Sequence, residues 1–318
     1  MKKSHVLLLA AMLGGMLTQA QYFIGLRGSN YGGITNVNYN PAIANSPYWL
    51  DINLIGAAAT FNNNYVGISH KALLHPSYFQ KADFQSLYMQ ERVNGKNKQA
   101  YFGAQVQGPL SFMFSFGNKK NRNKNAIGFS YHANAVMNAD HVSEIFARTA
   151  YYGLGEQANA ITGYLNGELN SSNLSLKAAM WNDYGITYSR VVYDKGANLF
   201  KVGGTIKLLQ PIAGAYGYIK NFNYKWTEYN NLTINDATAK YAYSNNFPSS
   251  ANTAGNSLAD YWRNGMNFKN GTPTAGGDIG VIYEWQPEKS KGADMDCHCE
   301  PFSDKKHYKL AAGFSVMD

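Results

Sequence analysis

The sequence predicts an all-β protein, an antiparallel transmembrane β-barrel, and three observations lead to this prediction. Apolar and small polar residues alternate with a period of two along several segments. The chain begins with a segment typical of exported proteins. Only 15% of the residues are charged, against about 25% in soluble domains, and the 24 tyrosines and 31 glycines suit barrel strands with aromatic girdles.

Residues 1–20 are predicted to be a signal peptide. Lys2 and Lys3 precede a short apolar stretch, which ends at the small-residue cleavage site Thr18-Gln19-Ala20. No later stretch has the roughly 18 apolar residues of a membrane-spanning helix, so strands would have to cross the bilayer. Residues 21–47 are expected to form a separate N-terminal segment, because Gly25–Pro47 is rich in glycine and asparagine and contains Asn40-Pro41-Ala42.

Residues 48–318 are expected to form the barrel domain, and the clearest alternation in it runs from Phe102 to Phe116. Its length of about fifteen residues exceeds the five or six that are usual in globular domains. One face presents Gln105 and Gln107 among small residues. The other face is apolar and carries Phe102, Ala104, Val106, Leu110, Phe112, Phe114 and Phe116. Lipid on one side and a wet lumen on the other would explain both faces.

Further strands are expected on either side of this segment. Ile127–Met137 alternates clearly, and with Phe102–Phe116 it predicts a hairpin that turns through residues 117–125. A short helix is expected within Asp140–Leu154, where apolar residues have helical spacing. About nine or ten strands result, the others at Tyr48–Phe61, Tyr65–His70, Tyr184–Tyr188, Phe200–Leu208, Tyr216–Trp226, Leu232–Tyr243, Ile279–Trp285 and Tyr308–Val316.

Several motifs together resemble an uncharacterised family of Gram-negative outer-membrane barrels. The motifs are Asn38-Tyr39-Asn40-Pro41-Ala42-Ile43-Ala44, residues 49–56, residues 63–67, Trp181-Asn182-Asp183-Tyr184-Gly185, residues 201–209, residues 278–285 and the segment from Lys309. The Asn-Pro-Ala motif is also similar to that of FadL-like long-chain fatty-acid transporters. That resemblance implies a FadL-like barrel in the outer membrane, with residues 21–47 folded into it as a hatch. The resemblance implies about fourteen strands, so either the last strand closes on the first or the barrel is incomplete at its C-terminus.

The polar residues on the predicted strands are candidates for facing a lumen or a ligand rather than for catalysis. His132 shares a strand face with Ser130 and Asn134, but one strand does not position a catalytic triad. Neither G-x-S-x-G nor H-E-x-x-H occurs. The lumen candidates are Gln105, Gln107, His132, Asn134, Arg190, Lys201, Lys207 and Glu284.

No metal or cofactor is predicted. Cys297, His298 and Cys299 lie close together between acidic residues, but their spacing differs from that of zinc sites, and a loop with or without a disulfide is expected instead. The net charge of +8 is compatible with nucleic acid, but part of it lies in one expected turn, at Lys119, Lys120, Arg122 and Lys124. In an exported protein, that turn is expected to be solvated or to meet anionic lipid head groups.

These observations predict a non-enzymatic outer-membrane barrel that conducts or binds a small hydrophobic molecule, with outer-membrane lipids as its surroundings. One alternative is an anchor or shuttle for secreted proteins, by analogy with the FadL-like barrel of type IX secretion, whose partners would be secretion machinery or cargo. Another is a lipid hydrolase that acts through His132.

Overall fold

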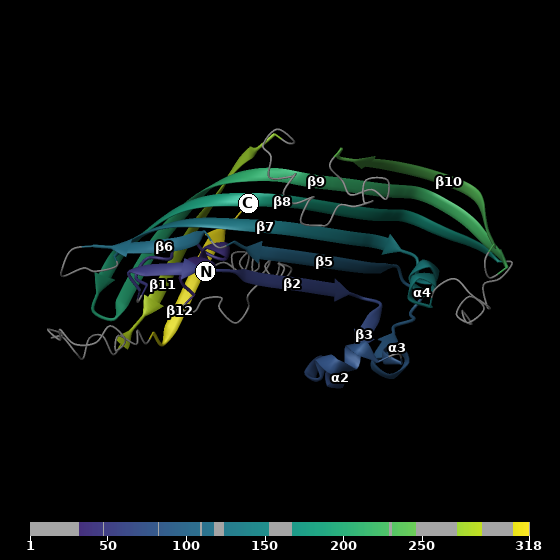
Figure 1. The fold of residues 1–318 in the computed structure, drawn as a ribbon, viewed down its shortest axis with the longest axis horizontal. Helices are drawn as coiled ribbons and strands as arrows, with labels where there is room; N and C mark the ends of the chain where they lie inside the picture. Colours follow the sequence, from purple (N-terminus) through teal and green to yellow (C-terminus); the bar gives the residue numbers. More distant parts are fainter. Residues whose placement is uncertain are drawn as a thin grey trace, which may run out of the picture.

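The computed structural model describes residues 32–46, 48–81, 83–108, 110–117, 124–152, 167–228, 231–245, 272–287 and 308–317. Most of them belong to one antiparallel β-sheet, in which the long strands run the length of the molecule (Figure 1). The all-β, antiparallel class predicted from the sequence is therefore confirmed. The predicted signal peptide and the Cys297–Cys299 region lie outside the described residues.

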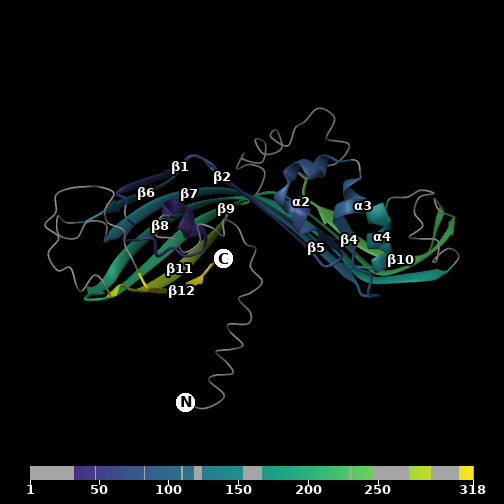
Figure 2. The same ribbon diagram turned by 90° about the horizontal axis from the view of Figure 1, so that it is seen from below.

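Ten strands make up this main sheet. They are β1 (Leu50–Asn53), β2 (Gly56–Asn63), β5 (Lys98–Gln107), β6 (Ser111–Phe116), β7 (Asn125–Val142), β8 (Glu168–Lys195), β9 (Asn198–Glu228), β10 (Asn231–Tyr243), β11 (Thr274–Trp285) and β12 (Leu310–Val316). Strands β1 and β2 lie at one edge, and β12 and β10 lie at the other. The sheet curls strongly (Figure 2), but the described strands leave it open, so the predicted closed barrel is not observed.

Short elements lie at the two ends of the sheet. The 3-10 helix η2 (Gly33–Asn38) lies inside the curl at one end. At the other end are β3 (Val66–Ile68), α2 (His70–Leu74), η3 (Pro76–Gln80), α3 (Phe84–Tyr88), β4 (Met89–Glu91) and α4 (Glu144–Tyr152). The expected helix within Asp140–Leu154 is confirmed as α4, although β7 continues through Val142 before it. Among the described residues, no helix has the length and apolar character needed to cross a bilayer.

Several predicted strand boundaries are wrong. Tyr48–Phe61 is divided into β1 and β2, Tyr65–His70 ends as a strand at Ile68, and Tyr184–Tyr188 is part of the 28-residue β8. Phe200–Leu208 and Tyr216–Trp226 belong to a single strand, β9, of 31 residues. Its middle contains Pro211, which lies beside a register shift against β8, where the lack of a proline N–H is tolerated. Conversely, the Phe102–Phe116 segment is divided into β5 and β6, which pair with successive parts of β7. The predicted hairpin with Ile127–Met137 is confirmed.

The interruption between β5 and β6 lies opposite Tyr131 on β7, which pairs with Tyr184 of β8 on its other side. The Gly108 N–H donates to the Tyr131 carbonyl at 2.9 Å, and the Tyr131 N–H donates to Ser111 Oγ at 3.0 Å. A side chain at Gly108 would have no room, because a Cβ there would lie 2.1 Å from the Tyr131 ring. The break is therefore stabilised by one glycine and one hydroxyl group, which satisfy backbone groups that are costly to leave unpaired.

The side chains of the sheet form rows that cross it from edge to edge, because directly paired residues share a face. We call the face that contacts residues 32–46 the inner face and the opposite one the outer face. One apolar row on the outer face crosses seven strands, and all of its residues except Gly204 are exposed. It contains Leu50, Phe114, Ile127, Tyr188, Gly204, Ile279 and Val316. The sequence prediction of one apolar and one small, polar face is thus confirmed for this part of the sheet.

A cluster of hydrogen bonds around Glu91 attaches α4 to the β3–β4 hairpin. Arg148 on α4 donates to both Glu91 carboxylate oxygens, at 3.1 and 3.2 Å. Tyr65 and Tyr152 donate their hydroxyl groups to the same carboxylate, at 2.6 and 3.1 Å. Burial alone would raise the pKa of Glu91, but the hydrogen bonds from Tyr65 and Arg148 outweigh it and hold the pKa below the ordinary value.

We predict that Ser111→Ala destabilises the protein by about 1–3 kcal/mol, because the partly buried Tyr131 N–H loses the Ser111 Oγ acceptor. The free energy of unfolding in urea, measured in detergent, tests this. Ser86→Ala, on the exposed helix α3, serves as the control and should change stability much less. Equal stabilities of the two variants would contradict the role assigned to Ser111.

We also predict that acid weakens the attachment of α4. Folding lowers the pKa of Glu91, so its ionised carboxylate stabilises the folded state. This contribution is complete when the pH is above the unfolded pKa of 4.5. This contribution is lost as the pH falls through the lowered folded pKa. Hydrogen exchange of α4 amides, corrected for the intrinsic pH effect, should therefore accelerate as the pH falls below 4.5. In Glu91→Gln the exchange should already be faster at pH 7, and it should change less with acid.

Candidate functional site

The candidate site lies where the N-terminal segment, residues 32–46, packs against the inner face of the sheet. A row of small residues crosses the sheet beneath it. The row consists of Ser115, Ala126, Ser189, Gly203, Gly280 and Ser315, one from each of six adjacent strands. Each residue of this row is one position along its strand from a residue of the apolar outer row, so the two rows lie on opposite faces. The residues of the small row lack the bulk to fill the space above the inner face. The N-terminal segment occupies that space.

Two glycines in this small-residue row provide room for the Asn40-Pro41 corner. Gly203 on β9 and Gly280 on β11 are directly paired. A Cβ at Gly203 would lie 2.0 Å from the Pro41 carbonyl oxygen, and a Cβ at Gly280 would lie 2.1 Å from Asn40 Oδ1. Contacts this short do not occur, so any larger residue would displace the corner or the strands. The Pro41 backbone thus lies directly on β9 at Gly203, and the Asn40 side chain lies directly on β11 at Gly280.

Asn40 connects the segment to two strands at once. Its Nδ2 donates to the carbonyl oxygens of Val281 on β11 and Phe314 on β12, at 3.1 and 3.2 Å. Its Oδ1 accepts a hydrogen bond from the Ala42 N–H at 2.9 Å, which forms a local turn around Pro41. The side chain therefore fixes both the shape of the corner and its place on the sheet.

Further contacts hold the segment on both sides of this corner. Ser315 Oγ donates to the Tyr39 carbonyl at 2.7 Å, and the Ala44 N–H donates to Ser189 Oγ at 2.9 Å. The Ile34 N–H donates to Asp51 Oδ1 on β1 at 3.2 Å. An apolar core then joins the segment to four strands, and it contains Ile34, Val37, Ile43, Ala44, Met113, Ala126, Val191 and Leu199.

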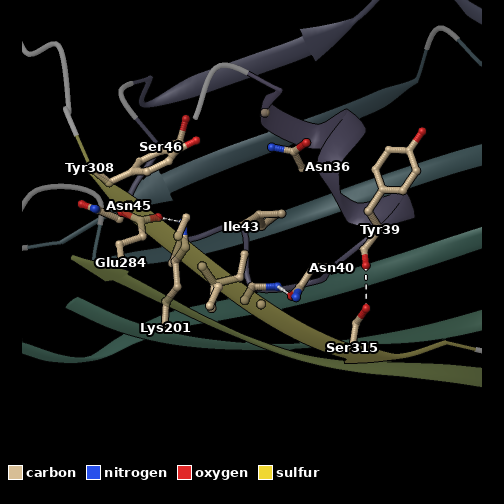
Figure 3. Close-up of a pocket in the computed structure, with 17 residues that line it drawn as sticks. Asn36, Tyr39, Asn40, Ile43, Asn45, Ser46, Lys201, Glu284, Tyr308 and Ser315 are labelled. Carbon is tan, nitrogen blue, oxygen red and sulfur yellow. Dashed lines mark hydrogen bonds and ion pairs between the residues drawn. The ribbon is translucent and has the colours of Figure 1, made fainter. Parts of the chain in front are cut away.

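A pocket of about 370 Å³ remains between the segment and strands β9, β11 and β12. Figure 3 shows Lys201 and Glu284 toward one end of it and Asn40 and Ser315 toward the other. Lys201 Nζ lies 2.8 Å from Glu284 Oε1, and Gln286 donates to the other Glu284 oxygen at 2.7 Å. These side chains are buried, and the ion pair compensates both charges. The end of the pocket that contains Lys201 and Glu284 therefore carries no net charge.

The lumen candidates chosen from the sequence fall into two groups on the inner face. Lys201 and Glu284 line the pocket, and Lys207 forms a second buried ion pair with Asp278 at 2.9 Å. Gln105, Gln107, His132 and Asn134 lie farther along the sheet, on β5 and β7. Arg190 was placed wrongly, because it is exposed and lies on the outer face between the inward residues Ser189 and Val191.

Sequence reasoning missed three residues of these sites. Asp183 pairs with His132, and its position on the polar face of its strand follows from the alternation at Tyr184–Tyr188. Gly203 and Gly280 also lie at polar-face positions. Their importance depends on being paired across two strands that are far apart in sequence, and a single sequence does not reveal that pairing.

The fold and this site define a class: an open, curled antiparallel sheet with an apolar outer face and an N-terminal segment packed on its inner face. A family model described as a family of unknown function (DUF5723) matches residues 41–318, and the chain belongs to this family. Neither a curated protein nor a solved structure matches the chain.

We predict that Asn40→Asp loosens the segment. The substitution keeps an acceptor for the Ala42 N–H but replaces the donor to Val281 and Phe314 with an oxygen, which leaves two carbonyls facing a carboxylate. Hydrogen exchange at Ala42 and Ala44 should become faster. Asn62→Asp on the exposed side of β2 introduces the same charge and should not have this effect. Unchanged exchange in Asn40→Asp would contradict the role of Asn40.

Proposed function

We propose that this protein is a non-enzymatic outer-membrane β-barrel that binds or conducts a small hydrophobic molecule, with residues 32–46 as a hatch over the inner face. One observation carries the proposal. The same strands bury small and polar residues under the N-terminal segment and expose large apolar residues on the other side.

The outer face supports a location in lipid. Ile206, Ile279 and Phe314 are 76%, 70% and 53% exposed, and they belong to three adjacent strands. A soluble monomer rarely exposes a continuous apolar surface of this kind, whereas a transmembrane barrel presents such a band to hydrocarbon. In hydrocarbon, the edges at β1–β2 and at β12–β10 would need strand partners, because unpaired backbone groups there cost several kcal/mol each. We therefore propose that the sheet is completed into a barrel in the membrane.

The inner face supports the role of residues 32–46 as a hatch. The segment is held by specific hydrogen bonds and by an apolar core, and none of its described residues belongs to a strand ladder. Once the register is set, the ladders of β8, β9, β11 and β12 run between the strands themselves, so the segment can leave while the paired sheet persists. The pocket beside it, together with the polar inner face, would then open toward the lumen.

We predict that Gly203→Val favours displacement of the hatch. Overpacking of this kind costs about 1–3 kcal/mol, so the displaced population should rise by about tenfold or more. In liposomes that contain the protein, uptake of a small hydrophobic dye should increase, and deletion of Gly25–Pro47 should have the same effect.

Gly217→Val is the matched control, because Gly217 lies on the same strand and a Cβ there would have no neighbour within 4 Å. It should behave like the wild type. If Gly203→Val and the deletion leave dye uptake unchanged while both proteins insert into liposomes, the segment is not a hatch.

A further inference from the structure

A second group of polar side chains lies on the inner face near the middle of the sheet, away from the N-terminal segment. Gln107 on β5, His132 on β7 and Asp183 on β8 are paired in one row across three strands. Gln105 and Asn134 are paired in the next row. All five side chains share the inner face, so the register alone brings them together.

Hydrogen bonds within the group fix the proton on His132. Asp183 Oδ1 lies 2.6 Å from His132 Nδ1, and Asn134 Nδ2 donates to Asp183 Oδ2 at 2.7 Å. Gln105 Nε2 in turn donates to Asn134 Oδ1 at 3.0 Å. An ionised carboxylate only accepts hydrogen bonds, so His132 Nδ1 carries a proton. With that proton on Nδ1, Nε2 is the acceptor of the neutral form of the ring, and it faces away from Asp183.

The hydrogen bonds within this group leave several of its polar atoms without a partner. Among the described residues, four of its buried atoms have no hydrogen-bond partner: His132 Nε2, Gln105 Oε1, and both Oε1 and Nε2 of Gln107. Gln107 is fully buried and His132 is 3% exposed. Other buried polar atoms of this face pair with one another, as Thr187 and Thr205 do at 2.7 Å, while Ser115 Oγ is a single unpaired atom apart from the group. Unpaired buried atoms are costly, and here they are concentrated in two adjacent rows.

We propose that Gln107 and His132 bind the head group of a neutral, amide-bearing amphiphile. A head group that carries a donor and an acceptor side by side can pair with both atoms of Gln107. The second N–H of a primary amide then reaches His132 Nε2. An anionic head group would meet the Asp183 carboxylate, and an ester would leave the acceptors unpaired. The inference rests on the proposed binding of a small hydrophobic molecule, and it specifies the chemistry of that molecule's polar end.

Four probes of equal chain length test the inference by calorimetric titration of the full protein in detergent. They are octanamide, methyl octanoate, octanoate and octylammonium. Octanamide should bind the wild type about tenfold more tightly than methyl octanoate, which is the effect of one well-made buried hydrogen bond. Gln107→Leu should abolish that difference without lowering the melting temperature, because the Gln107 side chain has no partner to lose in the free protein.

Gln90→Leu on the exposed side of β4 is the matched control and should bind all four probes as the wild type does. Equal binding of octanamide and methyl octanoate, tighter binding of either charged probe, or unchanged octanamide binding by Gln107→Leu would overturn the inference. If the four probes bind equally, hydrophobic binding stands and the head-group site is wrong. If none of them binds, the proposed function is wrong as well.

Discussion

The close contact between the Asn40-Pro41 corner and the paired glycines of β9 and β11 is the constraint on which the rest of the structure depends. Gly203 and Gly280 must be opposite one another, or the corner has no room. Asn40 must then reach the carbonyls of β11 and β12 from that position. The register of three strands and the path of the N-terminal segment are therefore fixed by the same few atoms.

This register also determines which face of the sheet is apolar. A slip of one residue would turn every side chain of a strand to the other face. It would bring Ile279 under the segment and move Gly280 to the outside. Because the segment tolerates only small residues beneath it, the contact disfavours such a slip. The apolar outer row and the small inner row both follow from the pairing of Gly203 with Gly280.

The sequence was informative where the signal is local, and it failed where the signal depends on pairing. Alternation along Phe102–Phe116 and Ile127–Met137 predicted the hairpin, and helical spacing predicted α4. The break at Gly108 was missed because alternation resumes in the same phase after it. The single strand β9 was missed because Pro211 and the neighbouring register shift interrupt its pattern. His132 was predicted as a lumen residue from its strand face. Its partner Asp183 was not, because it lies 51 residues away in the sequence.

The orientation of the outer row toward lipid is the central claim, and quenching by brominated lipids tests it most directly. In a Cys297→Ser, Cys299→Ser background, a fluorophore attached at Ile279→Cys on the outer face should be quenched strongly when the lipid chains carry bromine. A fluorophore at Lys96→Cys, in the exposed turn before β5, should be quenched much less. Strong quenching at Ile279 only would support a sheet that faces the bilayer. Equal, weak quenching at both positions would contradict it.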